Sequence, residues 1–178
     1  IATDHLIAQG AKTIAFVGGV EGREVTAERM SGYLARMQVA GLAPHVISGR
    51  PTRAFGRETA AWLMDQPEID AAICFNDLVA LGMISGFAGH GRLVGNDFRL
   101  VGFDDIEDAA QAYPALSSIH CDIAGFGEQI AAKLLRWMKE DVHPVAETRT
   151  PGSLVVRASS GQVIKPPSVP RAKSPRMR

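Results

Sequence analysis

The stretch that decides the fold is DAAICFNDLVALGMISGFA, residues 70–88. After Asp70, its next five residues form a short apolar run with β-branched and aromatic members, which predicts a buried strand over residues 70–75. Asn76 and Asp77 follow directly, and their side-chain oxygens can accept the unpaired N–H groups of a first helical turn. A helix is therefore predicted from this point to about Ala88. A strand that passes at once into a helix is the repeating unit of a parallel sheet.

The same alternation continues on both sides of this stretch. Further strands are predicted at 13–17, 45–47, 99–101, 117–120 and 153–156, and further helices at 2–9, around 30–37, at 54–66 and at 123–139. The strands are short and apolar without alternation, as in sheets that are covered on both faces. The predicted fold is α/β: a doubly wound, flavodoxin-like parallel sheet with helices on both faces.

The composition argues against several classes of protein. The 178 residues carry 19 Lys and Arg against 19 Asp and Glu, so the formal net charge is zero and a strongly basic nucleic-acid module is not expected. No apolar run approaches the roughly 18 residues that a membrane span needs, so no membrane partner is expected. Cys74 and Cys121 cannot form a disulfide framework, and we predict reduced core thiols in a cytoplasmic protein.

Signatures of enzymes and metal sites are absent from the sequence. Gly18, Gly19 and Gly22 do not have the spacing of a dinucleotide-binding loop, and neither a phosphate loop nor a nucleophile elbow occurs. The five histidines show no paired metal-ligand spacing. A nucleotide-dependent enzyme with a doubly wound fold would need a phosphate loop, so we expect no catalytic residues, cofactor or metal.

Polar side chains follow the predicted strands at the edge where open parallel sheets bind ligands. Asn76 follows the central strand, Asp104 follows the strand at 99–101, and Arg29 lies one turn into the helix after the first strand. Carboxylate, amide and guanidinium groups together can bind a polyhydroxylated ligand or another small metabolite. The alternatives are structural: Asn76 as a helix cap, Arg29 as a solvated charge, and Asp104 or Asp105 as a cap of the following turn.

The helix that begins near Asp77 is apolar on every side. Ser85 is its single polar residue between Leu78 and Gly89. The sheet would cover one side, so the other side is predicted to need a partner chain or domain. An apolar surface without a partner is the alternative.

Both ends of the chain are unusual. Residues 165–178 contain five Lys or Arg, four Pro and no acidic residue, and such a segment cannot bury enough apolar surface to order itself. Residues 161–178 are therefore predicted to be a disordered, basic, proline-rich tail, with a weak phosphate-binding arm as the alternative. The chain opens at Ile1 within a helical pattern, which gives the expectation of a fragment of something longer.

Six stretches, in matching order and spacing, resemble the LacI/GalR family of transcription regulators over about residues 2–160. They are HLIAQGAKTIAFVGG (5–19), RMSGY (29–33), FNDLVALG (75–82), LVGFDD (100–105), PALSSI (114–119) and LVVR (154–157). Ribose-type periplasmic binding proteins share the fold and some of these motifs. One departure is Ala11, which stands where the family usually has His after a glycine.

The resemblance implies the C-terminal part of a two-subdomain, periplasmic-binding-protein-like core. In that family an effector in the cleft alters the operator affinity of an N-terminal helix-turn-helix. The family's effector contacts map onto Arg29, Asn76 and Asp104, and Ile123 stands where some members carry a stacking aromatic. Because the helix-turn-helix and the N-terminal subdomain are missing, operator DNA is expected as a partner only through that missing domain.

The resemblance also implies a homodimer. Copies of helix 78–88 and of the loop 106–113 are expected to meet at a twofold interface. The expected anchors are Leu78, Leu81, Ile84, Phe87 and Tyr113.

The resemblance divides the chain into three parts before the tail. Residues 1–120 are the effector-binding subdomain, 121–152 the crossover and a helix that would pack on the missing subdomain, and 153–160 a returning strand. Helix 123–139 keeps an apolar face that includes Ile130, Leu134 and Met138. Such a face is too large to leave in water, so we expect either another copy of the chain or the chain's own sheet to cover it. The alternative is that the sequence is only the surviving part of a longer polypeptide.

Two functions follow from the resemblance. The first is the effector-binding and dimerisation portion of a LacI-type regulator with a sugar-like effector. The alternative is the C-terminal half of a periplasmic sugar-binding transport protein. The apolar helix 78–88 favours the regulator, because a monomeric solute receptor needs no partner surface.

Overall fold

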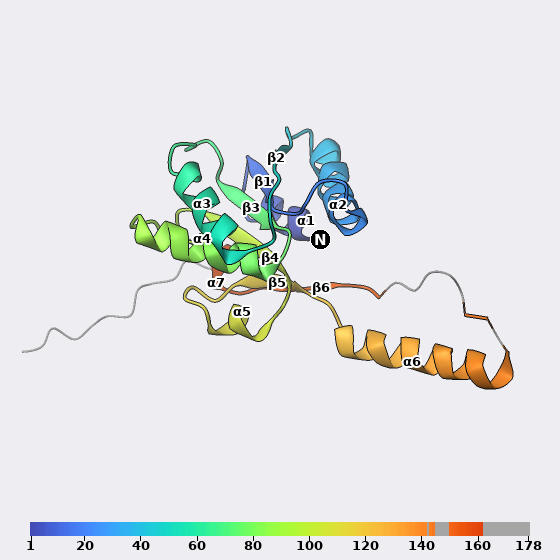
Figure 1. The fold of residues 1–178 in the computed structure, drawn as a ribbon. Helices are drawn as coiled ribbons and strands as arrows, with labels where there is room; N and C mark the ends of the chain where they lie inside the picture. Colours follow the sequence, from blue (N-terminus) through green and yellow to red (C-terminus); the bar gives the residue numbers. More distant parts are fainter. Residues whose placement is uncertain (142, 145–149, 162–178) are drawn as a thin grey trace, which may run out of the picture.

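The structure, a computed structural model, describes residues 1–141, 143–144 and 150–161. Six strands form one sheet in the order β2-β1-β3-β4-β5-β6, and helices cover both of its faces (Figure 1). The strands are β1 Ile14–Val17, β2 His45–Ile47, β3 Ala71–Cys74, β4 Arg99–Asp104, β5 Ser117–His120 and β6 Ser153–Val155. The helices are α1 Ala2–Ala8, α2 Glu24–Ala40, α3 Arg53–Leu63, α4 Asp77–Gly89, α5 Glu107–Gln111, α6 Ile123–Glu140 and α7 Ala158–Gly161.

The predicted doubly wound arrangement is confirmed for the first five strands. They pair in parallel, with β1 and β3 at the centre of the helix-covered region. Parallel strands place all of their carboxyl ends at one edge of the sheet. The segments that follow β1, β3 and β4 therefore meet at that edge.

The last strand differs from the prediction. β6 pairs antiparallel with β5, and it ends at Val155 instead of continuing to residue 160. Beyond it, a serine hydroxyl replaces the neighbouring strand as hydrogen-bond partner: the Arg157 amide donates to Ser117 Oγ at 2.7 Å. The chain then turns into the short helix α7.

An apolar core on each face holds the sheet to its helices. On the face covered by α1 and α2, Leu6, Phe16 and Met37 are fully or almost fully buried. The Tyr33 hydroxyl donates to the Ile14 carbonyl at 2.7 Å, which fixes α2 on β1. Burying side chains of this size stabilises the fold by about 1.5–3 kcal/mol each.

Helix α4 is covered by its own chain. α3 packs against it so closely that a Cβ added at Gly82 would lie 2.1 Å from the Arg53 carbonyl oxygen. The sheet covers one side of α4 and α3 covers another, so the argument that its apolar character requires a partner chain is wrong. Among the five expected interface anchors, Leu81, Ile84 and Phe87 are buried within the chain. Leu78 and Tyr113 remain 37% and 59% exposed.

Helix α6 extends away from the sheet and has no buried residue (Figure 1). Ile130, Leu134 and Met138 are 41%, 48% and 75% exposed. The expectation that this helix covers its own sheet is therefore wrong, because helices α1 to α4 already occupy the two faces. Coverage by another copy stays a prediction. No helix among the described residues has the length and apolar character to span a membrane.

The two cysteines have different surroundings. Both are free, but only Cys74 lies in the core, whereas Cys121 is half-buried, so the prediction of two core thiols holds for the first alone. Burial raises the pKa of the Cys74 thiol well above its ordinary value, so this thiol stays protonated. The expected tail at 161–178 lies outside the described residues apart from Gly161.

Candidate functional site

The structure brings Arg29 and Asp104 together at the carboxyl edge of the sheet. Arg29 lies on α2, and its Nη2 is 3.2 Å from Oδ1 of Asp104, at the end of β4. Its Nη1 donates to the carbonyl oxygen of Phe75, directly after β3. Arg29 therefore links two strand ends, and the reading of it as a solvated helix charge is wrong.

Two phenyl rings hold the Arg29 guanidinium in place. Its central carbon lies 4.6 Å from the ring centroid of Phe75 and 3.8 Å from that of Phe103. A cation over an aromatic face is stabilised by about 0.5–2 kcal/mol, more as water is excluded. Sequence reasoning missed both rings, although each is the residue directly before a predicted site residue.

Asn76 lies at the same edge and acts as a helix cap. Its Oδ1 accepts a hydrogen bond from the Val79 amide at 3.1 Å, and its Nδ2 is 3.5 Å from the Pro51 carbonyl oxygen. The cap alternative is thus realised in this structure. The side chain is only half-buried.

Asp104 is held in an uncommon backbone conformation. Its φ is 107° and that of Asp105 is 53°, both in the region that favours glycine. Conformations of this kind cost on the order of 1–3 kcal/mol each and persist where surrounding contacts fix them. Burial raises the pKa of the Asp104 carboxyl, and the Arg29 guanidinium partly offsets that rise.

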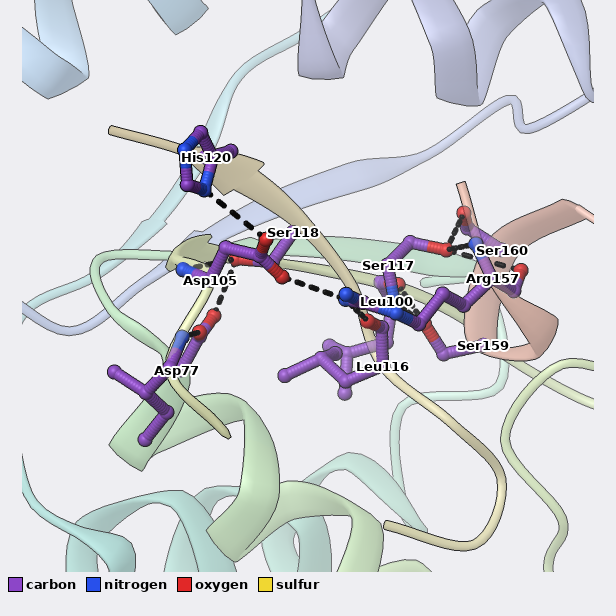
Figure 2. A network of polar contacts seen from close by, with 11 residues as sticks. Asp77, Leu100, Asp105, Leu116, Ser117, Ser118, His120, Arg157, Ser159 and Ser160 are labelled. Atoms are coloured by element: carbon purple, nitrogen blue, oxygen red, sulfur yellow. Dashed lines mark hydrogen bonds and ion pairs between the residues drawn. The ribbon is translucent and has the colours of Figure 1, made fainter. Parts of the chain in front are cut away.

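Asp77 is a buried residue near the site. The sequence analysis predicted for it only a role in capping the helix. Asn76 supplies the cap, while the Asp77 carboxylate faces the turn after β4 (Figure 2). Its Oδ1 accepts from Ser118 Oγ at 2.6 Å and its Oδ2 from the Ile106 amide at 2.9 Å. Burial raises the pKa of Asp77, and these two hydrogen bonds oppose the rise.

Asp105 does not cap the turn into α5. The residue that precedes this helix, Ile106, makes no side-chain cap hydrogen bond. Asp105 instead pairs with Arg157, with 2.7 Å between Nη1 and Oδ1, and with His120, with 3.2 Å between Nδ1 and Oδ2. The capping alternative for Asp105 is therefore wrong.

Arg29 borders two cavities. One, of about 260 Å³, lies on the face covered by α1 and α2 and is lined by apolar residues that include Phe16, Ile73 and Ile119. The other, of about 400 Å³, lies beyond the strand ends and is lined by Glu28, Arg29, Cys121, Asp122, Ile123, Phe126 and Thr150. Ile123 thus lines the outer cavity, and an aromatic side chain stands one turn further along α6, at Phe126. Its spacing of three residues from Ile123 is the signal that sequence reasoning passed over.

The arrangement suits binding. A guanidinium, a carboxylate and an amide at one edge can donate and accept hydrogen bonds, and Phe126 adds an aromatic ring to the lining of the outer cavity. Within the part of the chain that the structure describes, no group of three or more His, Cys, Asp or Glu side chains could hold a metal ion.

Comparisons with known proteins show the family of the chain. The model of the periplasmic binding protein-like domain family matches residues 3–160. The HTH-type transcriptional repressor PurR of Vibrio campbellii is 32% identical over 165 residues, which cover 88% of this chain and 48% of PurR. PurR of Actinobacillus pleuropneumoniae serotype 3 is 31% identical over 145 residues, covering 79% of this chain and 43% of that protein.

Solved structures give the same picture. A dimeric Lac repressor with an 11-residue C-terminal deletion superposes with a TM-score of 0.83 at 25% identity, covering 89% of this chain and 59% of the repressor chain. A LacI-family regulator from Arthrobacter sp. FB24 gives a TM-score of 0.80 at 27% identity, covering 90% and 61%. The chain spans about half the length of the curated relatives that it matches. These matches show that the chain belongs to the LacI family of transcription regulators and corresponds to its periplasmic-binding-protein-like, effector-binding domain.

Proposed function

We propose that this chain is the effector-binding and dimerisation portion of a LacI-type regulator. A small, sugar-like metabolite binds against Arg29, Asn76 and Asp104 and changes the affinity of an N-terminal helix-turn-helix domain for operator DNA. The proposal places this regulator in the cytoplasm, where operator DNA is available. The observation that carries it is the Arg29–Asp104 pair, fixed at the strand ends on two phenyl rings and beside a cavity of about 400 Å³.

The chemistry of this edge supports a neutral, hydroxyl-rich ligand. Arg29 and Asp104 neutralise each other, so a ligand with a net charge would leave one of them without compensation. A hydroxyl group can accept from the guanidinium and donate to the carboxylate at once. A transport receptor remains the alternative function, and the named relatives are repressors.

The dimerisation part of the proposal rests on the edge of α4. Leu78 and Tyr113 are exposed. A groove of about 370 Å³ between α3, α4 and α5 includes Tyr113 together with atoms of Leu81 and Ile84. An exposed aromatic beside a groove is a common anchor of protein interfaces.

The effector part is tested in the complete gene product. Calorimetry measures binding of D-ribose, D-galactose, adenosine and adenine, and fluorescence anisotropy measures binding to DNA from upstream of its own gene. Asp104→Asn keeps a side chain that tolerates a positive φ but removes the charge. Each charge-assisted hydrogen bond is worth about 1.5–3 kcal/mol, so we expect the affinity of the compound that binds to fall about tenfold or more.

Operator binding without effector should be unchanged in Asp104→Asn. Asp65→Asn, at an exposed carboxyl away from the site, is the matched control and should bind like the parent. If adenine alone binds tightly, the effector is a flat heterocycle and not a sugar-like compound. An Asp104→Asn protein with undiminished effector response would refute the site.

A further inference from the structure

At the end of β4, Asp104 adopts a backbone conformation that residues other than glycine do not favour. Asp104 and Asp105 have φ values of 107° and 53° in succession. Two neighbouring non-glycine residues in this region need contacts from outside the turn to hold them.

The inner side of the turn is tied to Asp77. The Asp105 amide donates to Ser118 Oγ at 3.1 Å, and Ser118 Oγ donates to Asp77 Oδ1 at 2.6 Å. The Ile106 amide donates to Asp77 Oδ2 at 2.9 Å. These bonds fix the amides that follow Asp104, but none of them holds the Asp105 carboxylate.

Two side chains hold that carboxylate, His120 at Oδ2 and Arg157 at Oδ1 (Figure 2). His120 is half exposed, whereas Arg157 is mostly buried. Arg157 Nη1 donates to Asp105 Oδ1 at 2.7 Å and to the Leu116 carbonyl at 2.7 Å. The side chains of Arg157 and Asp105 are only 20% and 12% exposed, so water screens the pair little.

Arg157 is itself immobilised by its neighbours. Ser117 Oγ accepts from the Arg157 amide at 2.7 Å and donates to its carbonyl at 3.0 Å. Ser160 Oγ donates to the same Ser117 hydroxyl at 2.7 Å. The backbone of Arg157 is therefore held in place, so its guanidinium is less mobile than that of an ordinary surface arginine.

We propose that Arg157 is a positioning residue of the effector site: its ion pair with Asp105 fixes the left-handed turn from which Asp104 reaches Arg29. The role of Asp104 toward an effector rests on the proposed function, whereas the role of Arg157 toward the turn does not. Arg157 follows β6, 52 residues after Asp105, so the site is complete only when the chain has returned to the sheet.

The first test measures the turn directly. Crystal structures and three-bond amide couplings of the full chain are compared for the parent, Arg157→Gln, Arg157→Lys and Arg36→Gln. Arg36 pairs with Asp4 at 2.7 Å on the exposed surface and is the matched control. In Arg157→Gln we expect Asp104 to leave the positive-φ region and its contact with Arg29 to be lost.

The control and the conservative variant separate positioning from general stability. Arg36→Gln should retain the parent geometry, and Arg157→Lys should restore part of it because the charge returns without the rigid, planar guanidinium. If Arg157→Gln does not fold, Asp105→Asn removes the same ion pair at a residue type that tolerates a positive φ. A folded Arg157→Gln or Asp105→Asn protein with the Asp104–Arg29 contact unchanged would overturn the proposal.

The second test measures binding in the complete gene product with D-ribose, D-galactose, adenosine and adenine. We expect about a tenfold loss of affinity in Arg157→Gln, partial recovery in Arg157→Lys and no change in Arg36→Gln. Equal affinity in Arg157→Gln and the parent would also overturn the proposal. If none of the four compounds binds the parent, the proposed function fails, and the turn geometry still decides the role of Arg157.

Discussion

Helices α4 and α6 are both rich in apolar residues, yet α4 is largely buried and α6 has no buried residue. α4 is apolar on all sides because the sheet and α3 both pack against it. α6 is polar on one side and apolar on the other, and Ile130, Leu134 and Met138 on its apolar side are exposed. In this molecule, therefore, the helix that is apolar all round is the one covered by its own chain, and cover of the one-sided helix α6 by another copy stays a prediction.

The largest expected effect compares a glycine in each helix. Gly82→Ala places a methyl group against the Arg53 carbonyl, where backbone atoms cannot move aside. The helix propensity of alanine is better by about 1 kcal/mol, but overpacking costs about 1–3 kcal/mol, and the contact at Gly82 is severe enough for the cost to dominate. We expect a lower free energy of unfolding in urea.

Gly127→Ala in α6 is the matched control. Apart from its chain neighbours and the backbone of its own helix, no described atom lies within 4 Å of its added Cβ. The free energy of unfolding should stay level or rise slightly. If both variants behave alike, the close contact between α3 and α4 is absent in solution.

Sedimentation distinguishes whether α4 or α6 forms the dimer interface. Sedimentation is measured for the parent, for Leu78→Glu with Tyr113→Glu, and for Leu134→Gln with Met138→Gln. We expect a dimer for the parent and a monomer for the first pair, because two charges cannot be buried without partners. The second pair should stay dimeric. A monomer from the second pair alone would move the interface to α6.

The smallest effect concerns Asp77, at the start of α4. Burial raises the pKa of this carboxyl in the folded state above its ordinary value of 3.8. The folded protein therefore holds this proton more tightly than the unfolded chain, and stability falls as the pH rises from 3.8 through the raised pKa. Unfolding at a series of pH values should show this fall in the parent and less of it in Asp77→Asn. The exposed Asp65→Asn control should follow the parent.

The alternation of strands and helices predicted the sheet because each local signal agreed with the global arrangement. Asn76 shows this well, since its cap marks the point where β3 passes into α4. The antiparallel direction of β6 could not be predicted, because Leu154-Val155-Val156 has the same apolar pattern in either direction. For α4, single-residue polarity could not show that Gly56 and Gly82 allow α3 to approach closely enough to cover it.

The site was predicted in outline from the rule that ligands bind at strand ends. Arg29 and Asp104 were found because they are charged and follow strands. The partners that hold them were not found, because Phe75 and Phe103 have the character of ordinary core residues in sequence. Arg157 is distant from Asp105 along the chain, so only the paired strands β5 and β6 reveal their contact.

The pairing of β5 with β6 has a mechanical consequence. The chain leaves the sheet at the end of β5 and returns to it in β6, with His120 opposite Ser153. Adjacent strands lie about 4.8 Å apart, so the two attachment points of the excursion lie close together. The segment that carries α6 is therefore tied to the sheet at neighbouring residues, and one of them, His120, also contacts Asp105 in the turn next to Asp104.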